Sequence, residues 1–317
     1  MTEELDFLPN ELTVSNLSAL SPTQSALQEE RICEISELAY DAARFSASAL
    51  SEGMEFYDAF AIISEGLDFG EYIVHSDSLS ANVSRLRAYL KTLCNRDKII
   101  FADLYTERLA EFGILPSEID LLPVGDLAES FVYVKNSFAD EAYEVFSQDF
   151  ADPRVRYAAD FRDAVARVVD GEVSYCLLPL EERGSRLPTV EEMIYRSDLK
   201  ITSVTPVFGF DGSLDMKFAL VSKLFAPFEY EADDDRYFEI RIPMKSDGLI
   251  AEVITAADSY FYSCHRVNTN TYHFEGVEQH SYSLIFKSRG SSFLKLLVYL
   301  VLFVPEFTPV GIYKNLE

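Results

Sequence analysis

Several recognisable signals are absent from this sequence of 317 residues. The four cysteines, Cys33, Cys94, Cys176 and Cys264, are scattered without a CxxC spacing, and the four histidines form no HxxxH pair. Neither a disulfide framework nor a zinc site is therefore predicted. We expect free thiols in a reducing compartment, no metal and no cofactor.

Long apolar runs are also absent. The strongest run, Leu296 to Val304, is much shorter than the roughly 20 residues that cross a bilayer. The first residues, Met1-Thr2-Glu3-Glu4, are acidic where a secretory signal is basic. The sequence therefore predicts a cytoplasmic protein with no membrane partner.

Basic residues are few: the sequence has 27 lysines and arginines but 53 acidic residues, which gives a net charge of −26. Such a chain repels phosphate backbones and anionic lipids, which argues against nucleic acid and membrane surfaces as partners. Salt screens charges beyond about 8–10 Å, so a local basic pocket can still bind an anionic substrate. With 48% apolar residues, the chain can fold as a multidomain globular protein.

Residues 1–125 are predicted to be mainly helical. After a frayed leader at 1–27, apolar residues recur every three or four positions from Glu29 to Gly53, and shorter helices are expected at 56–64, 83–93 and 101–112. Five basic residues, Arg85, Arg87, Lys91, Arg96 and Lys98, gather in one stretch. They indicate either a solvated helix face or an anion-binding cluster.

A change of pattern near residue 125 predicts a second domain at 126–228. Prolines and a glycine between Leu115 and Gly125 mark the boundary. Beyond it, strands at 131–134, 155–157 and 173–178 alternate with helices from Ser137 and at 160–169. Such alternation is typical of a parallel α/β sheet.

The last segment, 229–317, predicts a ferredoxin-like domain. Strands are expected at 237–243, 263–274, 281–287 and 307–313, with helices at 248–260 and 293–303, which gives the order βαββαβ. The predicted fold class is therefore α/β and α+β: a helical region, one α/β lobe and a ferredoxin-like domain.

Three segments of the α/β lobe carry a family resemblance: Asn136 to Ala142, Phe161 to Val165, and Gly171 to Arg183. In order and spacing they resemble the prephenate dehydratase family, which turns prephenate into phenylpyruvate. The resemblance implies a periplasmic-binding-protein-like lobe followed by an ACT domain, which binds phenylalanine at a dimer interface. Gly248-Leu249-Ile250 and Val310-Gly311-Ile312-Tyr313 stand where that domain has similar motifs.

The departures from the family pattern affect the motifs that the resemblance implies for binding and catalysis. Glu182 and Arg183 replace an asparagine and a serine, and Lys135-Asn136 replaces a glycine-bearing loop. Met216-Lys217-Phe218 stands where the family has Thr-Arg-Phe, and methionine is no proton donor. The family's second lobe is reduced to residues 208–215, too few to fold independently. Candidate catalytic residues by position are Glu181, Arg183 and Lys217, although these are also typical of solvated charges.

These features favour a catalytically impaired dehydratase homologue of phenylalanine metabolism that senses an amino acid or acts as a scaffold. The alternatives are an active prephenate dehydratase, with a chorismate mutase-like helical segment that uses the basic cluster, and an interaction module without a small ligand. Expected ligand-binding residues are Ser137, Asp247, Gly248, Leu249 and Ile250. The apolar helix 293–303 must be covered by a partner subunit or by another domain. We expect a homodimer or higher oligomer through the C-terminal domain.

Overall fold

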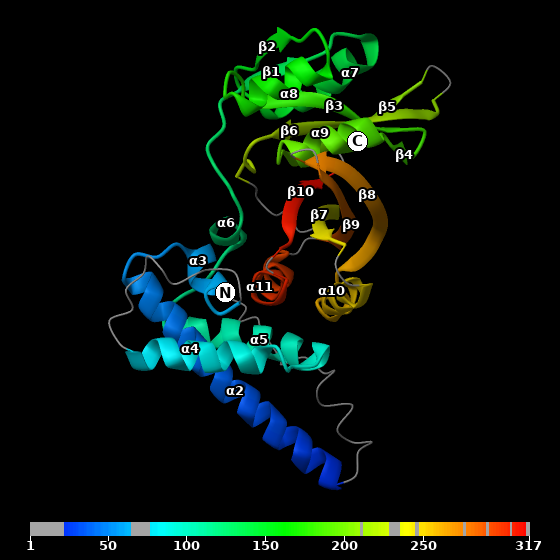
Figure 1. Ribbon diagram of the computed structural model, residues 1–317. Coiled ribbons are helices and arrows are strands. Elements are labelled where there is room, and N and C mark those ends of the chain that lie inside the picture. Colours follow the sequence, from blue (N-terminus) through cyan, green and yellow to red (C-terminus); the bar gives the residue numbers. More distant parts are fainter. Residues whose placement is uncertain are drawn as a thin grey trace, which may run out of the picture. The chain divides into compact units, whose positions relative to one another are not determined.

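The computed structural model describes residues 22–64, 77–209, 212–227, 235–244, 247–274, 277–289, 292–304 and 306–314. These residues form two compact units (Figure 1). The first unit contains helices α2 (Pro22–Ser51), α4 (Asp77–Leu90) and α5 (Asn95–Glu111). The second contains α3 (Phe56–Ala61) and every element from α6 (Glu118–Leu121) onward. Most of the predicted leader lies outside the described residues, and α2 begins within its last part.

The helical unit is built on the pairing of α2 with α5. Ile35, Ala42 and Ala49 of the predicted apolar stripe of α2 are buried, as are Phe101 and Tyr105 of α5. The Ser46 and Tyr105 hydroxyls lie 2.8 Å apart in this core. Gly53 and Gly113, just beyond the ends of α2 and α5, have φ values of 91° and 76°, which glycine adopts without a steric penalty. The predicted helices of this region are therefore present.

The α/β lobe has a parallel core, as the alternating pattern predicts. Strand β1 (Ser130–Tyr133) pairs in parallel with β2 (Arg154–Tyr157) and β3 (Tyr175–Glu182). Helix α7 (Ser137–Phe146) covers one face through Ala139 and Phe146. Helices α8 (Phe161–Val169) and α9 (Pro188–Arg196) pack on the other face. Because successive side chains of a strand point to opposite faces of the sheet, the position of each apolar residue in its strand decides which helix layer it contacts.

Two antiparallel strands complete the lobe. Strand β6 (Leu214–Ser222) pairs with β3, and β5 (Lys200–Phe208) pairs with β6, so the order is β2-β1-β3-β6-β5. Residues 209–213 alone separate β5 from β6 along the chain. The ladder runs to this turn, with Val207 opposite Met216 and Phe208 opposite Leu214. This topology is a single periplasmic-binding-protein-like lobe.

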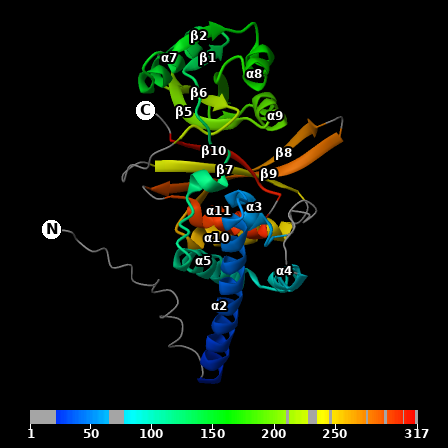
Figure 2. The ribbon, with the colours of Figure 1, turned by 90° about the vertical axis from the view of Figure 1, so that its left-hand side faces the viewer.

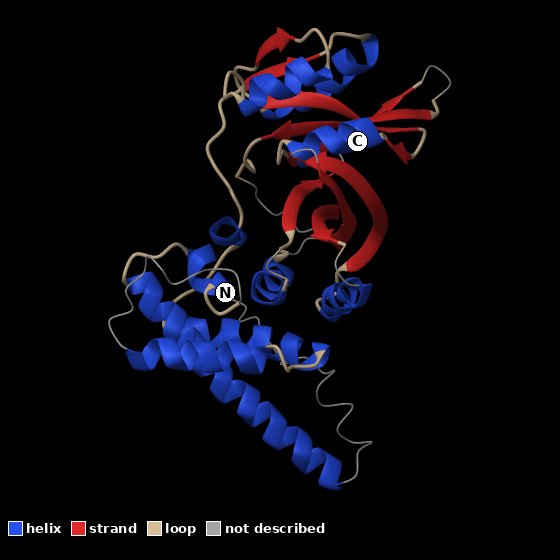
Figure 3. Ribbon diagram, in the orientation of Figure 1, coloured by secondary structure: helices blue, strands red, loops and turns tan. Residues whose placement is uncertain are grey.

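The C-terminal domain has the predicted ferredoxin-like order. Strands β7 (Asp235–Pro243), β8 (Ser263–Phe274), β9 (Val277–Arg289) and β10 (Thr308–Lys314) are arranged β10-β7-β9-β8, with α10 (Asp247–Ser259) and α11 (Leu294–Phe303) between them in the chain. Figures 2 and 3 show both helices on one side of this sheet and α9 on the other. Phe238 of β7 contacts Phe293 on the α11 side, with ring centroids 5.3 Å apart.

The two sheets join edge to edge through β5 and β10. The junction is one parallel bridge between Ile201 and Gly311. A Cβ atom on Gly311 would lie 2.9 Å from the Cβ of Ile201 and 2.8 Å from the Tyr313 ring. A glycine is needed here because the two strands approach so closely.

Helix α11 is covered by other elements of its own chain, which is one of the two explanations that its apolar sequence left open. Residues Leu296 to Leu302 are all buried, and α11 contacts α3, α6 and α10. The Glu118 carboxylate of α6 accepts a hydrogen bond from the Phe293 backbone N–H at the start of α11. The apolar face around Leu297 and Val301 therefore has a covering in one chain and does not require a partner subunit.

Candidate functional site

Two of the three candidate catalytic residues lie side by side in the lobe sheet. Glu181 near the end of β3 is opposite Lys217 of β6, and their charged groups are 3.8 Å apart. Met216 lies one position before Lys217 and pairs with Glu182. The ladder is irregular between Pro179 and Glu181, since the proline cannot donate a ladder hydrogen bond.

The third candidate, Arg183, does not join them. It is exposed in the turn between β3 and β4 (Ser185–Arg186), with a positive φ of 49°, followed by Gly184 at 81°. Two left-handed residues are what a tight two-residue hairpin requires. The hairpin folds the chain back so that Arg186, rather than Arg183, lies opposite Glu181.

Arg186 connects the lobe to the C-terminal domain. Its Nε donates to the Glu181 carboxylate at 3.1 Å, and its Nη2 donates to Glu239 of β7 at 2.9 Å. Glu239 is completely buried and accepts further hydrogen bonds from the hydroxyls of Tyr195, Ser283 and Tyr313 at 3.1–3.3 Å. The buried carboxylate therefore has both a counterion and hydrogen-bond donors, as burial requires.

Arg266 of β8 is the third cation at Glu181, and its Nη1 lies 2.6 Å from the Oε1 of that carboxylate. A small cavity of about 40 Å³ opens here. Its lining residues are Leu180, Glu181, Arg186, Val204, Lys217, Tyr237, His265, Arg266, Ile285 and Tyr313. We call this set the junction cavity. A cavity of this size accommodates a water or a small anionic group, not a molecule such as prephenate.

Burial controls the ionisation of several groups around the junction cavity. Desolvation raises the pKa of Glu191 on α9 to about 7; nearby Glu239 and Glu181 add to the shift, while Arg186 and Arg266 oppose it. Desolvation lowers the pKa of His265, and the neighbouring Lys287, Lys217 and Arg266 lower it further. His265 therefore contributes less positive charge to the cavity than a solvent-exposed histidine would.

The predicted ligand-binding residues lie away from the junction cavity. Ser137 is exposed at the start of α7, where the Asn136 side chain accepts a hydrogen bond from the Ala139 N–H at 2.9 Å. Asp247 to Ile250 form the first turn of α10. That helix covers the sheet face opposite Glu239, so the structure does not bring Ser137, Glu181 and Gly248 into one site.

The charged groups at the junction cavity pair with one another. A carboxyl that serves as general acid or base must reach its substrate in the required protonation state. Glu181 is instead 8% exposed and held by Arg186, Lys217 and Arg266. Its burial and these ion pairs leave little of the Glu181 carboxylate open to a substrate.

Sequence reasoning missed Arg186, Glu239 and Tyr195 as members of this network. In an alternating strand, Glu239 has the pattern of a solvent-facing residue, and nothing local indicates that α9 covers that face. Arg186 had one usable signal. It follows Glu181 by five residues across Arg183-Gly184, which is a spacing typical of a tight hairpin.

Within the described residues, no group of three potential metal ligands comes together, and no helix is both long and apolar enough to cross a membrane. The cysteines are free, with Cys176 buried and Cys33 and Cys94 exposed. Burial raises the pKa of the Cys176 thiol well above its ordinary value, which makes it unreactive.

No protein-family model matches the sequence, and no curated protein matches it. Among solved structures, the chain is similar to the prephenate dehydratase from Streptococcus mutans, with 8% identity, a TM-score of 0.47, and 59% of this chain and 99% of that chain covered. The prephenate dehydratase from Arthrobacter aurescens in complex with L-Phe gives 12% identity, a TM-score of 0.44, and coverage of 58% and 89%. GqqA, a quorum quenching acylase, gives 13% identity, a TM-score of 0.43, and coverage of 59% of this chain and 95% of that chain.

Proposed function

We propose that this protein is a non-catalytic relative of the prephenate dehydratases that senses an amino acid through an ACT-type C-terminal domain. The observation that carries the proposal is the direct turn from β5 to β6. The resemblance places a second lobe between these strands, and the substrate cleft between the lobes. Here residues 209–213 alone connect them, so the cleft has no second wall.

The polar groups of the remaining lobe support the same conclusion. Met216 stands at the position of the family's threonine and has no proton to donate. Lys217 and Glu181 pair with each other, and Arg186 and Arg266 add to that pair. Loss of a positioned proton donor costs on the order of 10²–10⁴ in rate. We therefore expect prephenate turnover at the uncatalysed background.

The proposed sensing site is the first turn of α10, at Asp247, Gly248, Leu249 and Ile250. Free backbone N–H groups and the positive end of the helix dipole can hold an amino-acid carboxylate without a basic side chain. Gly248 is exposed, so backbone approach to it is sterically possible. Pairing of two C-terminal domains, which the resemblance implies, would have to use a surface other than α11, since α3 and α6 cover it.

Calorimetric titration of the purified chain with phenylalanine, tyrosine and prephenate tests the proposal. An aromatic amino acid should bind, and Gly248→Val should abolish binding because its side chain blocks backbone approach. Thr255→Val is the matched control, since it places the same side chain two turns along the same exposed face. Unchanged amino-acid binding by Gly248→Val would contradict the sensing site.

A parallel assay of phenylpyruvate formation tests the loss of catalysis separately. Turnover of prephenate well above background, removed by Glu181→Ala or Lys217→Ala, would contradict it. The two measurements are independent, because a protein without turnover can still bind an amino acid.

A further inference from the structure

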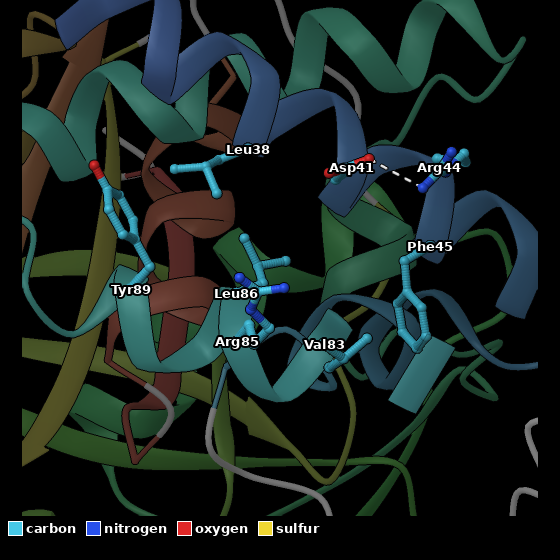
Figure 4. A pocket seen from close by; sticks show the side chains of 8 residues that line it. All are labelled: Leu38, Asp41, Arg44, Phe45, Val83, Arg85, Leu86 and Tyr89. Carbon is cyan, nitrogen blue, oxygen red and sulfur yellow. Dashed lines mark ion pairs between the residues drawn. The ribbon is translucent and has the colours of Figure 1, made fainter. Parts of the chain in front are cut away.

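A second pocket, separate from the proposed sensing site, lies within the helical unit. It has a volume of about 300 Å³ and lies between α2 and α4. Figure 4 shows the residues that line it: Leu38, Asp41, Arg44 and Phe45 from α2, and Val83, Arg85, Leu86 and Tyr89 from α4. This volume is at the lower end of the range for small-molecule sites. We call it the helical pocket.

One part of the helical pocket is apolar and firmly packed. Phe45, Val83 and Leu86 are buried to 6% exposure or less. The ring of Tyr89 is fixed from outside, because the Arg31 guanidinium donates a hydrogen bond to its hydroxyl and lies 5.3 Å from the ring centroid. A wall held in place in this way loses little entropy when a ligand binds.

The other part of the pocket is charged, with a positive balance. Arg44 pairs with Asp41 one turn earlier at 3.0 Å. Arg85 is exposed and makes no ion pair with any residue that the structure describes. Two arginines against one aspartate leave one net positive charge, in a chain whose total is −26. A free guanidinium is well suited to a carboxylate, to which it can bind in bidentate fashion.

We propose that the helical pocket binds a small organic monoanion: a carboxylate whose apolar or aromatic body packs on Phe45, Leu86 and Tyr89, and whose charged group pairs with Arg85. Both halves of the ligand are required. An anion alone would remain hydrated, and an apolar body alone would leave Arg85 without a partner.

Fluorescence titration of the full chain with 2-naphthoate tests this proposal. The chain has no tryptophan, so the probe can be excited apart from the protein. A ligand of this size is expected to bind with a dissociation constant near the millimolar range. Acetate, which lacks the body, and 2-naphthylmethanol, which lacks the charge, should both compete poorly. Equal competition by either compound would overturn the proposal.

Three variants test the role of charge. Arg85→Gln should weaken 2-naphthoate binding roughly tenfold. Arg96→Gln, an equal loss of charge at an exposed position of α5 outside the pocket, should leave it unchanged. Asp41→Asn should tighten binding a few-fold, because Arg44 would lose its competing carboxylate. Unchanged binding in Arg85→Gln, an equal loss in Arg96→Gln, or weaker binding in Asp41→Asn would overturn the assignment.

Discussion

Glu239 is a buried charged residue whose partners come from several elements. Its side chain is completely buried between the C-terminal sheet and α9, where Arg186 is its counterion. Breaking such a pair by removing one partner typically costs 3–5 kcal/mol, although the intact pair contributes little net stability. The pair therefore favours the one packing in which the β3–β4 hairpin and β7 meet.

Glu191 gives the same region a pH dependence. One carboxylate oxygen of Glu191 is buried without a hydrogen-bond partner among the described residues, and burial raises its pKa to about 7. The folded state then holds a proton that the unfolded state releases near pH 4.5. Stability contributed by this group is present below that pH and is lost as the pH rises toward 7.

We predict that Glu191→Gln loses less stability between pH 5 and pH 8 than the wild type does. The difference between the two proteins in this change of the free energy of unfolding should be on the order of 1–3 kcal/mol. The reason is that the amide has no charge to desolvate. Urea unfolding at the two pH values measures the difference. Glu192→Gln, at a half-buried neighbour, is the control and should retain the wild-type slope. An identical slope in Glu191→Gln would contradict the assignment.

At the scale of elements, the close crossing of β5 and β10 at Gly311 decides how the two sheets join. We predict that Gly311→Ala lowers the free energy of unfolding by about 1–3 kcal/mol, since the new methyl group would overlap the Tyr313 ring and Ile201 in a packed region. Thermal and urea unfolding measure it. Gly125→Ala is the matched control, because its methyl group would meet only the end of the Leu224 side chain, which can rotate away.

The same scale shows how far sequence patterns reach. Local periodicity predicted the helices of the first unit, the parallel core of β1, β2 and β3, and the order βαββαβ, because each depends on residues close in the chain. Contacts between elements distant in sequence were not predictable. Nothing near Glu239 indicates α9, and nothing near Leu297 indicates that α3, more than two hundred residues earlier, contacts its helix. The sensing role of Gly248 remains a prediction.

At the scale of the whole molecule, the burial of α11 separates two explanations for an apolar helix. A helix buried by a second subunit is stabilised by association, so its contribution depends on protein concentration. A helix buried within one chain contributes equally at every concentration. The contacts of α11 with α3, α6 and α10 are of the second kind.

We therefore predict that Leu297→Asp, which places a charge at a fully buried position, lowers the free energy of unfolding by several kcal/mol. The loss should be the same over about a hundredfold range of protein concentration. Lys295→Asp, at an exposed position of the same helix, should cost less than about 1 kcal/mol. Urea unfolding at each concentration, with sedimentation to record the mass of each variant, makes the comparison. A penalty that vanishes on dilution, accompanied by conversion of a wild-type dimer to a folded monomer, would show instead that α11 is buried between subunits.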